Sequence, residues 1–374
     1  MRTGNILLLS AVCSLAVVAC FLAGCGSVSK VTPPQSQVRS YNATASVGDF
    51  LTITIDSNAK TITYQNLTNG ESGTVAYTVS SDGTYAITDP NGNLLTAYEV
   101  PGTALVVEAA NQGPNKDTAA LITAIETAPA SINTFAGRNF NYIQFRTTTG
   151  GIEIGTVTVD AHGDIQHSSY WPFGVLSPGS SFNGGTFPAS SVTEDASGNF
   201  FTIAESNGAS DYVFGTANGF FAVDTEGGTI LGLPKAASKS FDASVAGTYT
   251  AVLYEKANAQ MGQNNVESGT PSEDKGTIVV GADGTVTVTD SKGNTMATGT
   301  LQAIADTSYI YDGTQNELPD PLYGMFTFRT STGSSQQDVF ASFQGNAVIF
   351  SSFETGLPLQ QNGVYNYFYG VGLK

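Results

Sequence analysis

Charged residues are scarce in this chain of 374 residues, and basic residues are the scarcest. Charged side chains make up 12% of the sequence, and 14 Lys and Arg stand against 31 Asp and Glu, which gives a formal net charge of −17. Proteins that bind nucleic acid place clustered Lys and Arg against the phosphates, so this composition argues against a nucleic-acid partner. The apolar fraction of 41% is ordinary, and a sizeable core can therefore form.

Side chains that carry much of enzyme chemistry are also few, with two His and one Trp. The sequence lacks a Gly-x-Ser-x-Gly elbow, a His-Glu-x-x-His helix and a phosphate-binding loop. His162 and His167 lie five residues apart across an expected turn, a spacing that puts them on opposite strand faces and predicts turn and surface roles. We therefore expect no catalytic residue, no metal site, no cofactor and no enzymatic activity.

Only three cysteines occur, and all of them precede residue 26. Cys13 and Cys20 lie in a stretch from Ile6 to Gly24 that carries no charge, and Arg2 is the one cation before it. The length of this stretch falls between a signal-peptide core and a transmembrane helix. With no thiol in the remainder of the chain, stability there has to come from packing and strand pairing.

The stretch ends in Leu22-Ala23-Gly24-Cys25, which resembles the lipobox of bacterial lipoproteins. The resemblance implies that residues 1–24 are a signal peptide, that cleavage occurs before Cys25, and that acyl chains on Cys25 anchor the protein to a membrane. Gly26 stands where an Asp favours inner-membrane retention in enterobacterial lipoproteins, so the outer membrane or cell surface is favoured. The alternative is an uncleaved membrane anchor, and both interpretations place the rest of the chain outside the cytoplasm.

Residues 25–46 are polar, contain Pro33-Pro34 and show no periodic apolar pattern, which predicts a lipidated flexible tether. After it, short segments such as Leu51 to Ile55 and Thr285 to Thr289 alternate apolar and polar residues, and turn signals such as Asp82-Gly83 separate them. This pattern predicts an all-β fold of three diverged antiparallel modules, sandwich-like or barrel-like. Their expected ranges are 47–132, 133–240 and 241–374.

Two sequence matches support the repetition of modules. Residues 82–93 match 283–294, and residues 155–163 match 276–284, although shared hairpin chemistry would produce similar matches. One short helix is expected over 118–128, because Asp117 is a good N-cap and Pro129 a stop. The polar stretch 257–275 is expected to be a long hairpin loop.

The segment Tyr170-Trp171-Pro172-Phe173 contains the only Trp beside two other aromatic residues. Exposed aromatic faces stack on sugars or partner surfaces, so Tyr170, Trp171 and Phe173 are candidate ligand-binding residues. A plug in a module core is the other interpretation of the same three residues.

Two further patterns have plainer explanations. The oxygen-rich segments 89–93 and 290–294 could hold Ca²⁺, but Lys292 replaces a donor in the second, which favours turn geometry in both. Asp306, Asp312, Glu317 and Asp320 are clustered in sequence, which fits a solvated acidic loop better than a catalytic pair.

The sequence thus predicts a lipid-anchored extracytoplasmic β-repeat protein with a structural, adhesive or partner-binding role at the cell envelope. Its partners would be the membrane, through the lipid, and a glycan or another envelope protein. A carbohydrate-binding surface lipoprotein is the first alternative, and a carboxylate-dependent hydrolase is the second.

Overall fold

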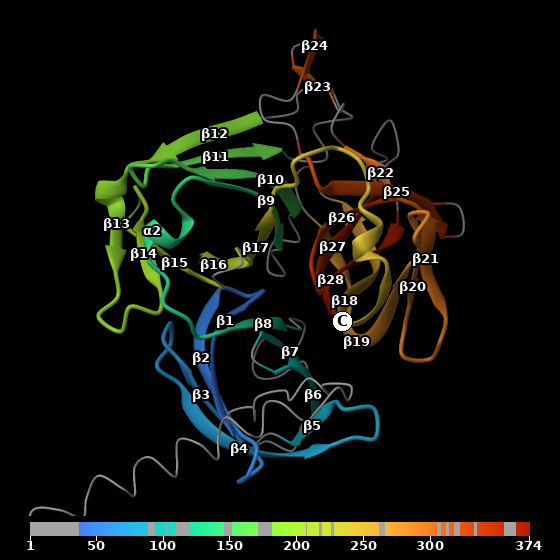
Figure 1. Cartoon of the computed structure of the whole chain (residues 1–374). Coiled ribbons are helices and arrows are strands. Elements are labelled where there is room, and N and C mark those ends of the chain that lie inside the picture. Colours follow the sequence, from blue (N-terminus) through green and yellow to red (C-terminus); the bar gives the residue numbers. More distant parts are fainter. Residues whose placement is uncertain are drawn as a thin grey trace, which may run out of the picture. The chain divides into compact units, whose positions relative to one another are not determined.

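Three antiparallel β-sheets make up the protein, and in each of them the first strand pairs with the last (Figure 1). The structure is a computed structural model. It describes residues 37–374 apart from 89–93, 102, 110–119, 146–151, 171–181, 207, 217–218, 226–227, 262–265, 305–307, 312–313, 318–321, 333–334 and 355–363. The all-β fold of three antiparallel, barrel-like modules predicted from the sequence is confirmed.

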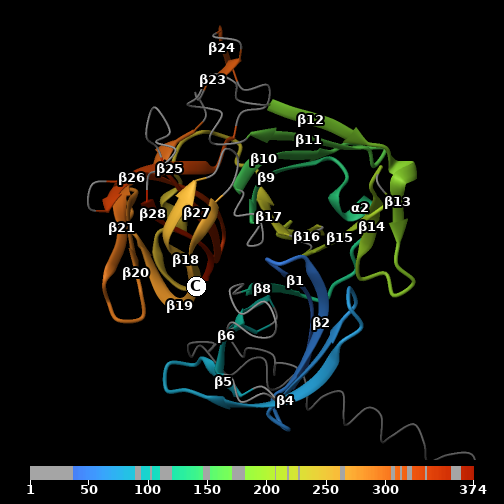
Figure 2. The same cartoon turned by 180° about the vertical axis from the view of Figure 1, so that it is seen from behind.

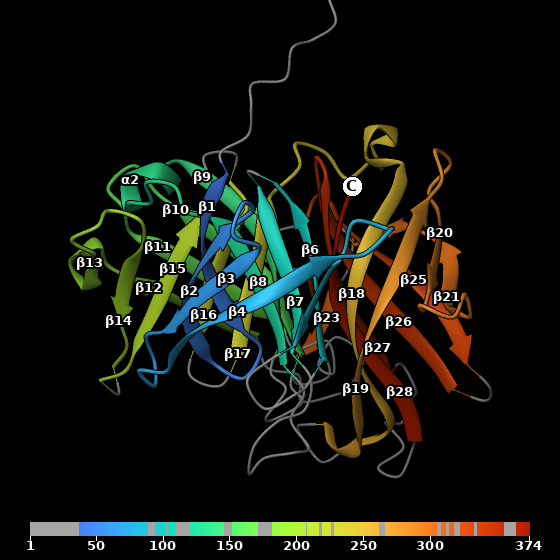
Figure 3. The same cartoon turned by 90° about the horizontal axis from the view of Figure 1, so that it is seen from below.

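The first sheet is a closed barrel in which the strands pair in chain order and β8 returns to β1. Figure 3 shows several of its strands side by side. Its strands are β1 (Val38–Ala45), β2 (Asp49–Asp56), β3 (Thr61–Asn66), β4 (Ser72–Val79), β5 (Tyr85–Thr88), β6 (Leu94–Val100), β7 (Ala104–Ala109) and β8 (Ala120–Glu126).

The second sheet has nine strands in the order β12-β11-β10-β9-β17-β16-β15-β14-β13. Its two edge strands, β12 and β13, are consecutive in the chain, so the sheet is a meander with one unpaired seam. Its elements are β9 (Arg138–Phe145), β10 (Ile152–Val159), β11 (Ile165–Tyr170), β12 (Phe182–Phe187), β13 (Val192–Glu194), β14 (Phe201–Ala204), β15 (Ser210–Gly215), β16 (Phe221–Thr225) and β17 (Gly228–Pro234).

The third sheet repeats this plan in the order β21-β20-β19-β18-β28-β27-β26-β25-β22, with its seam between β21 and β22. A separate hairpin pairs β23 (Ser308–Tyr311) with β24 (Thr314–Glu317). The strands of the sheet are β18 (Gly247–Met261), β19 (Val266–Val280), β20 (Thr285–Thr289), β21 (Thr295–Thr300), β22 (Gln302–Ala303), β25 (Met325–Thr332), β26 (Ser335–Gln344), β27 (Ala347–Glu354) and β28 (Val364–Leu373).

Each sheet encloses an apolar core of its own, and a fourth core joins all three sheets. The shared core contains Phe50 from the first sheet, Ile143 from the second and Val371 from the third. Alternation along the strands makes both kinds of core possible, because successive side chains point to opposite faces of a sheet. On β9, Tyr142 belongs to the core inside the second sheet, whereas Ile143 belongs to the shared core.

Residues 37–374 form a single compact unit, so the predicted module boundaries at 47, 133 and 241 stay predictions. The tether expected over 25–46 is wrong for residues 38–45, because these form β1 of the closed barrel. Tyr41 and Ala43 of this strand lie in the barrel core, whereas Asn42 donates a hydrogen bond from Nδ2 to the backbone oxygen of Asn199 at 2.9 Å. One face of β1 is thus apolar and the other is buried against polar groups. The sequence of such a strand has too few apolar residues to be recognised as a buried strand.

The helix expected over 118–128 is also wrong. Residues 120–126 form β8, which closes the first barrel between β7 and β1. The long loop expected over 257–275 is wrong as well, because most of that stretch lies in the paired strands β18 and β19.

Short helices lie elsewhere. The one α-helix in the described part of the chain is α2 (Ile132–Phe135), and two 3₁₀ turns are η1 (Ala189–Ser191) and η2 (Ala243–Val245). Among the described residues, no helix is long and apolar enough to span a membrane.

The two sequence matches have different structural meanings. Residues 155–163 and 276–284 match between β10 and β19, each the second strand of its sheet, which is an equivalent position. Residues 82–88 and 283–289 instead match the fifth strand of one sheet with the third of another. Both of those turns use an Asp oxygen that accepts from the Thr two residues on, so this match reflects shared turn chemistry.

Candidate functional site

A cavity of about 570 Å³ is lined by residues of the second sheet. Figures 1 and 2 show from opposite sides how the strands of this sheet curl around. Its volume falls within the range of small-molecule sites, roughly 300–1,000 Å³. Eight of the nine strands and α2 contribute lining residues, which makes it the interior of the curled sheet. The lining consists of Phe135, Phe140, Tyr142, Gln144, Glu153, Val157, Val159, Ile165, His167, Ser169, Phe187, Phe201, Ile203, Glu205, Ala209, Asp211, Val213, Phe221, Val223, Thr225 and Ile230.

One end of the cavity is aromatic. Phe135 of α2 is buried, and its ring meets those of Phe140, Phe201 and Phe221 edge-on at 5.9, 5.8 and 6.4 Å between centroids. The short helix thereby carries an apolar plug into the curl of the sheet, and Figure 1 shows α2 lying among the strands of this sheet. Edge-on aromatic packing of this kind makes a rigid, water-excluding floor.

The strand register places the polar lining residues at the other end. Along β9 the cavity-lining residues run from Phe140 through Tyr142 to Gln144, and their partners on β10 run from Val157 through Gly155 to Glu153. On β15 and β16, Asp211 and Thr225 likewise lie past the apolar pair Val213 and Val223. The cavity is therefore amphipathic from end to end.

Tyr142 organises the polar wall. Its hydroxyl donates to Glu153 Oε1 at 2.6 Å and lies 3.0 Å from Ser169 Oγ. The ring lies over Gly155, where an added Cβ would come within 2.6 Å of the ring and 2.2 Å of the backbone oxygen of Ser168. A glycine on β10 is thus what allows a tyrosine ring to lie flat against the wall.

His167 is a cavity residue that the sequence prediction missed. The expected turn role holds for His162, which is exposed beside Gly163, whereas His167 lines the cavity, is half-buried and stacks on Phe187 at 5.4 Å between ring centroids. Its Nδ1 is buried and has no hydrogen-bond partner in the described part of the chain. The sequence did contain a hint of this position: Ile165 lies two residues earlier in the strand, so its apolar side chain and His167 are on the same face.

Most of the residues predicted from the sequence to bind a ligand lie outside the described part of the chain. Cys25, Trp171 and Phe173 lie outside the described residues, as do 89–93, Asp306, Asp312 and Asp320. Tyr170 is the last residue of β11, where its backbone pairs with Ile154 and Phe182. The turn expected over 290–294 is present, with Asp290 accepting from the backbone of Lys292 and Asn294. No cluster of three metal-ligating side chains occurs among the described residues.

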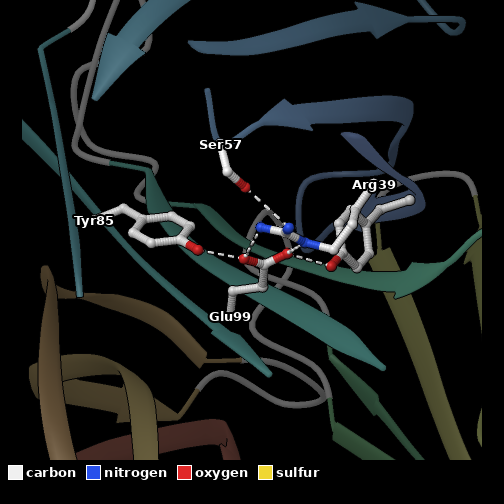
Figure 4. Close-up of polar contacts among 5 residues, drawn as sticks. Arg39, Ser57, Tyr85 and Glu99 are labelled. Atoms are coloured by element: carbon white, nitrogen blue, oxygen red, sulfur yellow. Dashed lines mark hydrogen bonds and ion pairs between the residues drawn. The ribbon is translucent and has the colours of Figure 1, made fainter. Parts of the chain in front are cut away.

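A second polar cluster lies in the first barrel (Figure 4), and all of its members except the half-buried Ser57 are buried. Arg39 donates from Nε to Glu99 Oε1 at 2.6 Å and from Nη2 to Oε2 at 2.8 Å, and a third bond runs from Nη1 to Ser57 Oγ at 2.9 Å. The hydroxyls of Tyr41 and Tyr85 also donate to Glu99. Burial and the Glu99 carboxylate raise the pKa of both tyrosines well above their usual range.

This cluster and the cavity differ in how well their polar groups are satisfied. Each Glu99 oxygen accepts two hydrogen bonds, so the Glu99 carboxylate is saturated by its neighbours. The second sheet encloses open volume instead, and the buried Nδ1 of His167 in its wall has no partner among the described residues. We therefore take the cavity as the candidate site and the first-barrel cluster as structural.

No family model and no curated protein matches the sequence. Among solved structures, a double mutant of transferrin-binding protein B from Haemophilus parasuis is similar at 9% identity and a TM-score of 0.26, over 91% of this chain and 76% of that one. Transferrin-binding protein B of Neisseria meningitidis is similar at 13% identity and a TM-score of 0.28, over 87% and 66%. At such low TM-scores neither fold nor function is transferred, and the function has to be inferred from the site.

Proposed function

We propose that this chain is a lipid-anchored binding protein of the cell envelope that holds a small molecule inside its second sheet. The amphipathic cavity of about 570 Å³ is the observation that supports this proposal most directly. Strands on nearly every side supply its walls, and only Glu205 and Ala209 of the lining come from a connection, the one between β14 and β15. Most of the site is therefore built on rigid elements.

A binding role fits the described cavity better than catalysis does. A nucleophilic site would need a histidine hydrogen-bonded to its nucleophile and oriented by a carboxylate. Here Ser169 pairs with the hydroxyl of Tyr142, and the buried Nδ1 of His167 has no described partner. The described side chains of the cavity therefore form no hydrogen-bonded set of nucleophile, histidine and carboxylate.

The anchor and the location rest on the sequence. Leu22-Ala23-Gly24-Cys25 supports lipidation at Cys25, and Gly26 after it supports the outer membrane or cell surface. Residues 26–37 are polar and contain Pro33-Pro34, which suits a spacer between the membrane and β1. A glycan or another envelope protein remains the alternative occupant, through Tyr170, Trp171 and Phe173.

Filling the cavity tests the binding proposal. We expect the full chain in lipid nanodiscs to bind the neutral probe tryptophol at one site in isothermal titration calorimetry. Val157→Phe should weaken that binding at least about tenfold by occupying the cavity, whereas Val279→Phe, on an exposed position of β19, should leave it unchanged. If Val157→Phe and Val279→Phe both bind tryptophol like the parent, the cavity is not its binding site and the proposal fails.

The anchor is tested separately. Cys25→Ser should abolish incorporation of labelled palmitate and the shift in mass that follows cleavage before residue 25. Labelling that survives the substitution would refute lipidation at Cys25 without bearing on the cavity.

A further inference from the structure

The charge of the cavity lining is one-sided. Glu153, Glu205 and Asp211 contribute acidic groups, and no Lys or Arg is among the described residues that line the cavity. Neither Glu153 nor Glu205 forms an ion pair with any described residue, and Glu153 accepts its hydrogen bond from the neutral hydroxyl of Tyr142. Carboxylates in a partly enclosed space attract a cation more strongly than carboxylates in open water.

The acidic groups lie at one end of the cavity only. Glu153 pairs with Gln144, four residues along β9 from Phe140 of the aromatic floor. Asp211 lies four residues along β15 from Gly215, the partner of the floor residue Phe221. A ligand that satisfies both ends needs an apolar body directed at the floor and a positive group directed at the acids. A small inorganic cation would leave the apolar volume empty.

His167 adds an imidazole ring at the depth of the apolar wall, where its register partners are Val157 and Gly185. The ring is half-buried and stacks on Phe187. A flat aromatic body can pack against such rings, so the wall favours an aromatic body over a branched aliphatic one.

We infer that the second sheet binds an amphipathic amine, with a flat apolar body against the aromatic floor and a protonated amine facing Glu153 and Glu205. This inference rests on the proposed function and specifies its ligand by charge. The acidic chain as a whole, with a net charge of −17, adds a long-range field that attracts such cations and repels anions of the same shape.

Three probes that share an indole ring and a two-carbon arm test the inference: tryptamine is cationic, tryptophol neutral and indole-3-propionate anionic. Calorimetry on the full chain in lipid nanodiscs should rank them in that order, with tryptamine at least about tenfold tighter than indole-3-propionate. Raising the salt from about 0.05 to about 0.5 M should weaken tryptamine binding more than tryptophol binding.

Carboxylate-to-amide variants locate the effect. Glu153→Gln keeps an oxygen that accepts from Tyr142, so the wall should stay intact while tryptamine binding falls by about fivefold more than tryptophol binding does. Glu205→Gln should act in the same way. Glu194→Gln, on an exposed position of β13, is the matched control and should change neither probe.

The outcomes separate the two proposals. Suppose that Val157→Phe blocks tryptophol binding, but that indole-3-propionate binds as tightly as tryptamine or more tightly. This result overturns the amine inference and leaves the proposed binding function intact. Failure of all three probes overturns both. A preference for tryptamine that survives Glu153→Gln and Glu205→Gln also overturns the inference, because the charge selectivity would then arise outside the cavity.

Discussion

At the scale of single residues, Asp224 is a buried carboxylate with a raised pKa. It lies on β16 against β1, is 4% exposed, and accepts a hydrogen bond from Thr44 Oγ1 at 2.8 Å. Thr44 also lies 2.8 Å from Thr229 Oγ1. Burial raises the pKa of Asp224 to about 7, and the Asp49 charge adds to the effect of burial while the Thr44 hydrogen bond opposes it.

This raised pKa makes stability depend on pH with a definite sign. Between about pH 4 and pH 7 the native state holds the Asp224 proton more tightly than the unfolded chain does, so the contribution of Asp224 to stability falls as pH rises, by at most about 1.4 kcal/mol per pH unit. Above that window its contribution is level. Asp224→Asn should remove this component, and urea unfolding of both proteins at about pH 4.5 and about pH 7.5 measures it.

The control is a carboxylate whose pKa is shifted in the opposite direction. Hydrogen bonds from the Ser197 side chain and backbone lower the pKa of Asp195, a partly exposed turn residue, so Asp195→Asn should not increase stability near neutral pH. If Asp224→Asn loses the same stability at both pH values, Asp224 does not titrate as the geometry requires.

Arg39 gives a second prediction at this scale. Arg39→Met would leave the Glu99 side chain, 1% exposed, without its cationic partner, and breaking a buried pair in this way costs about 3–5 kcal/mol. Lys275→Met breaks the pair with the half-exposed Asp82 instead and should cost under about 1 kcal/mol. Chemical denaturation of both variants makes the comparison, and equal losses would show that burial does not set the strength of the first pair.

At the scale of elements, β8 shows why the fold class was predictable and one of its strands was not. Alternation and Gly-containing turns identify strands that have one polar face. β8 instead has Ala124 in the barrel core and Leu121 and Ile125 in the core shared by the sheets, so both of its faces are buried. A short strand buried on both sides is a continuous apolar run, which periodicity cannot distinguish from a helix.

The candidate site was predictable only in part for a related reason. The strands that surround the cavity follow from alternation, but which residues share its polar end depends on strand register, and sequence does not give register across distant strands. Glu153 and Asp211 are far apart in the chain and lie at the same end only because β10 and β15 belong to one curled sheet. His167 likewise lines the cavity because β11 pairs with β10 in this sheet.

Glycines within strands make room for rings inside the second sheet, and Gly232 gives the prediction at this scale. An added Cβ would lie 1.9 Å from the ring of Phe221, which is 4% exposed and held by Phe135 and Phe140. Gly232→Ala should therefore destabilise the protein by about 1–3 kcal/mol, as overpacking does. Thermal or urea unfolding measures the loss.

A double-mutant cycle distinguishes this clash from a general intolerance of substitution. Phe221→Ala removes the ring and alone should cost about 3–5 kcal/mol, but the double variant should cost less than the sum of the two single losses. Strict additivity would contradict the proposed ring-over-glycine packing.

At the scale of the whole molecule, the three sheets are joined by more than their connecting segments. The rings of Phe145 and Tyr369 stack at 4.1 Å between the second and third sheets, and Phe50 and Tyr212 stack at 4.6 Å between the first and second. Asn141 also donates from Nδ2 to the backbone oxygen of Tyr323 at 2.7 Å. These contacts predict that residues 37–374 unfold as one cooperative unit.

Differential scanning calorimetry tests this cooperativity. Ile143→Ala in the shared core and Val288→Ala in the core of the third sheet should both lower the temperature of one and the same transition, the former by several degrees, since core truncations of this kind cost about 2–5 kcal/mol. Separate transitions, of which Val288→Ala moves only one, would show that the sheets unfold independently.

The pairing of first strand with last has a consequence in time. β9 hydrogen-bonds to β17, and β18 to β28, so the earliest strand of each of these sheets waits for a neighbour that is synthesised last. A chain delivered from its N-terminus cannot complete either sheet until its final strand has emerged. Whatever compartment receives this protein therefore receives unfinished sheets, and shielding the unpaired edges of β9 and β18 during that wait is part of what its assembly requires.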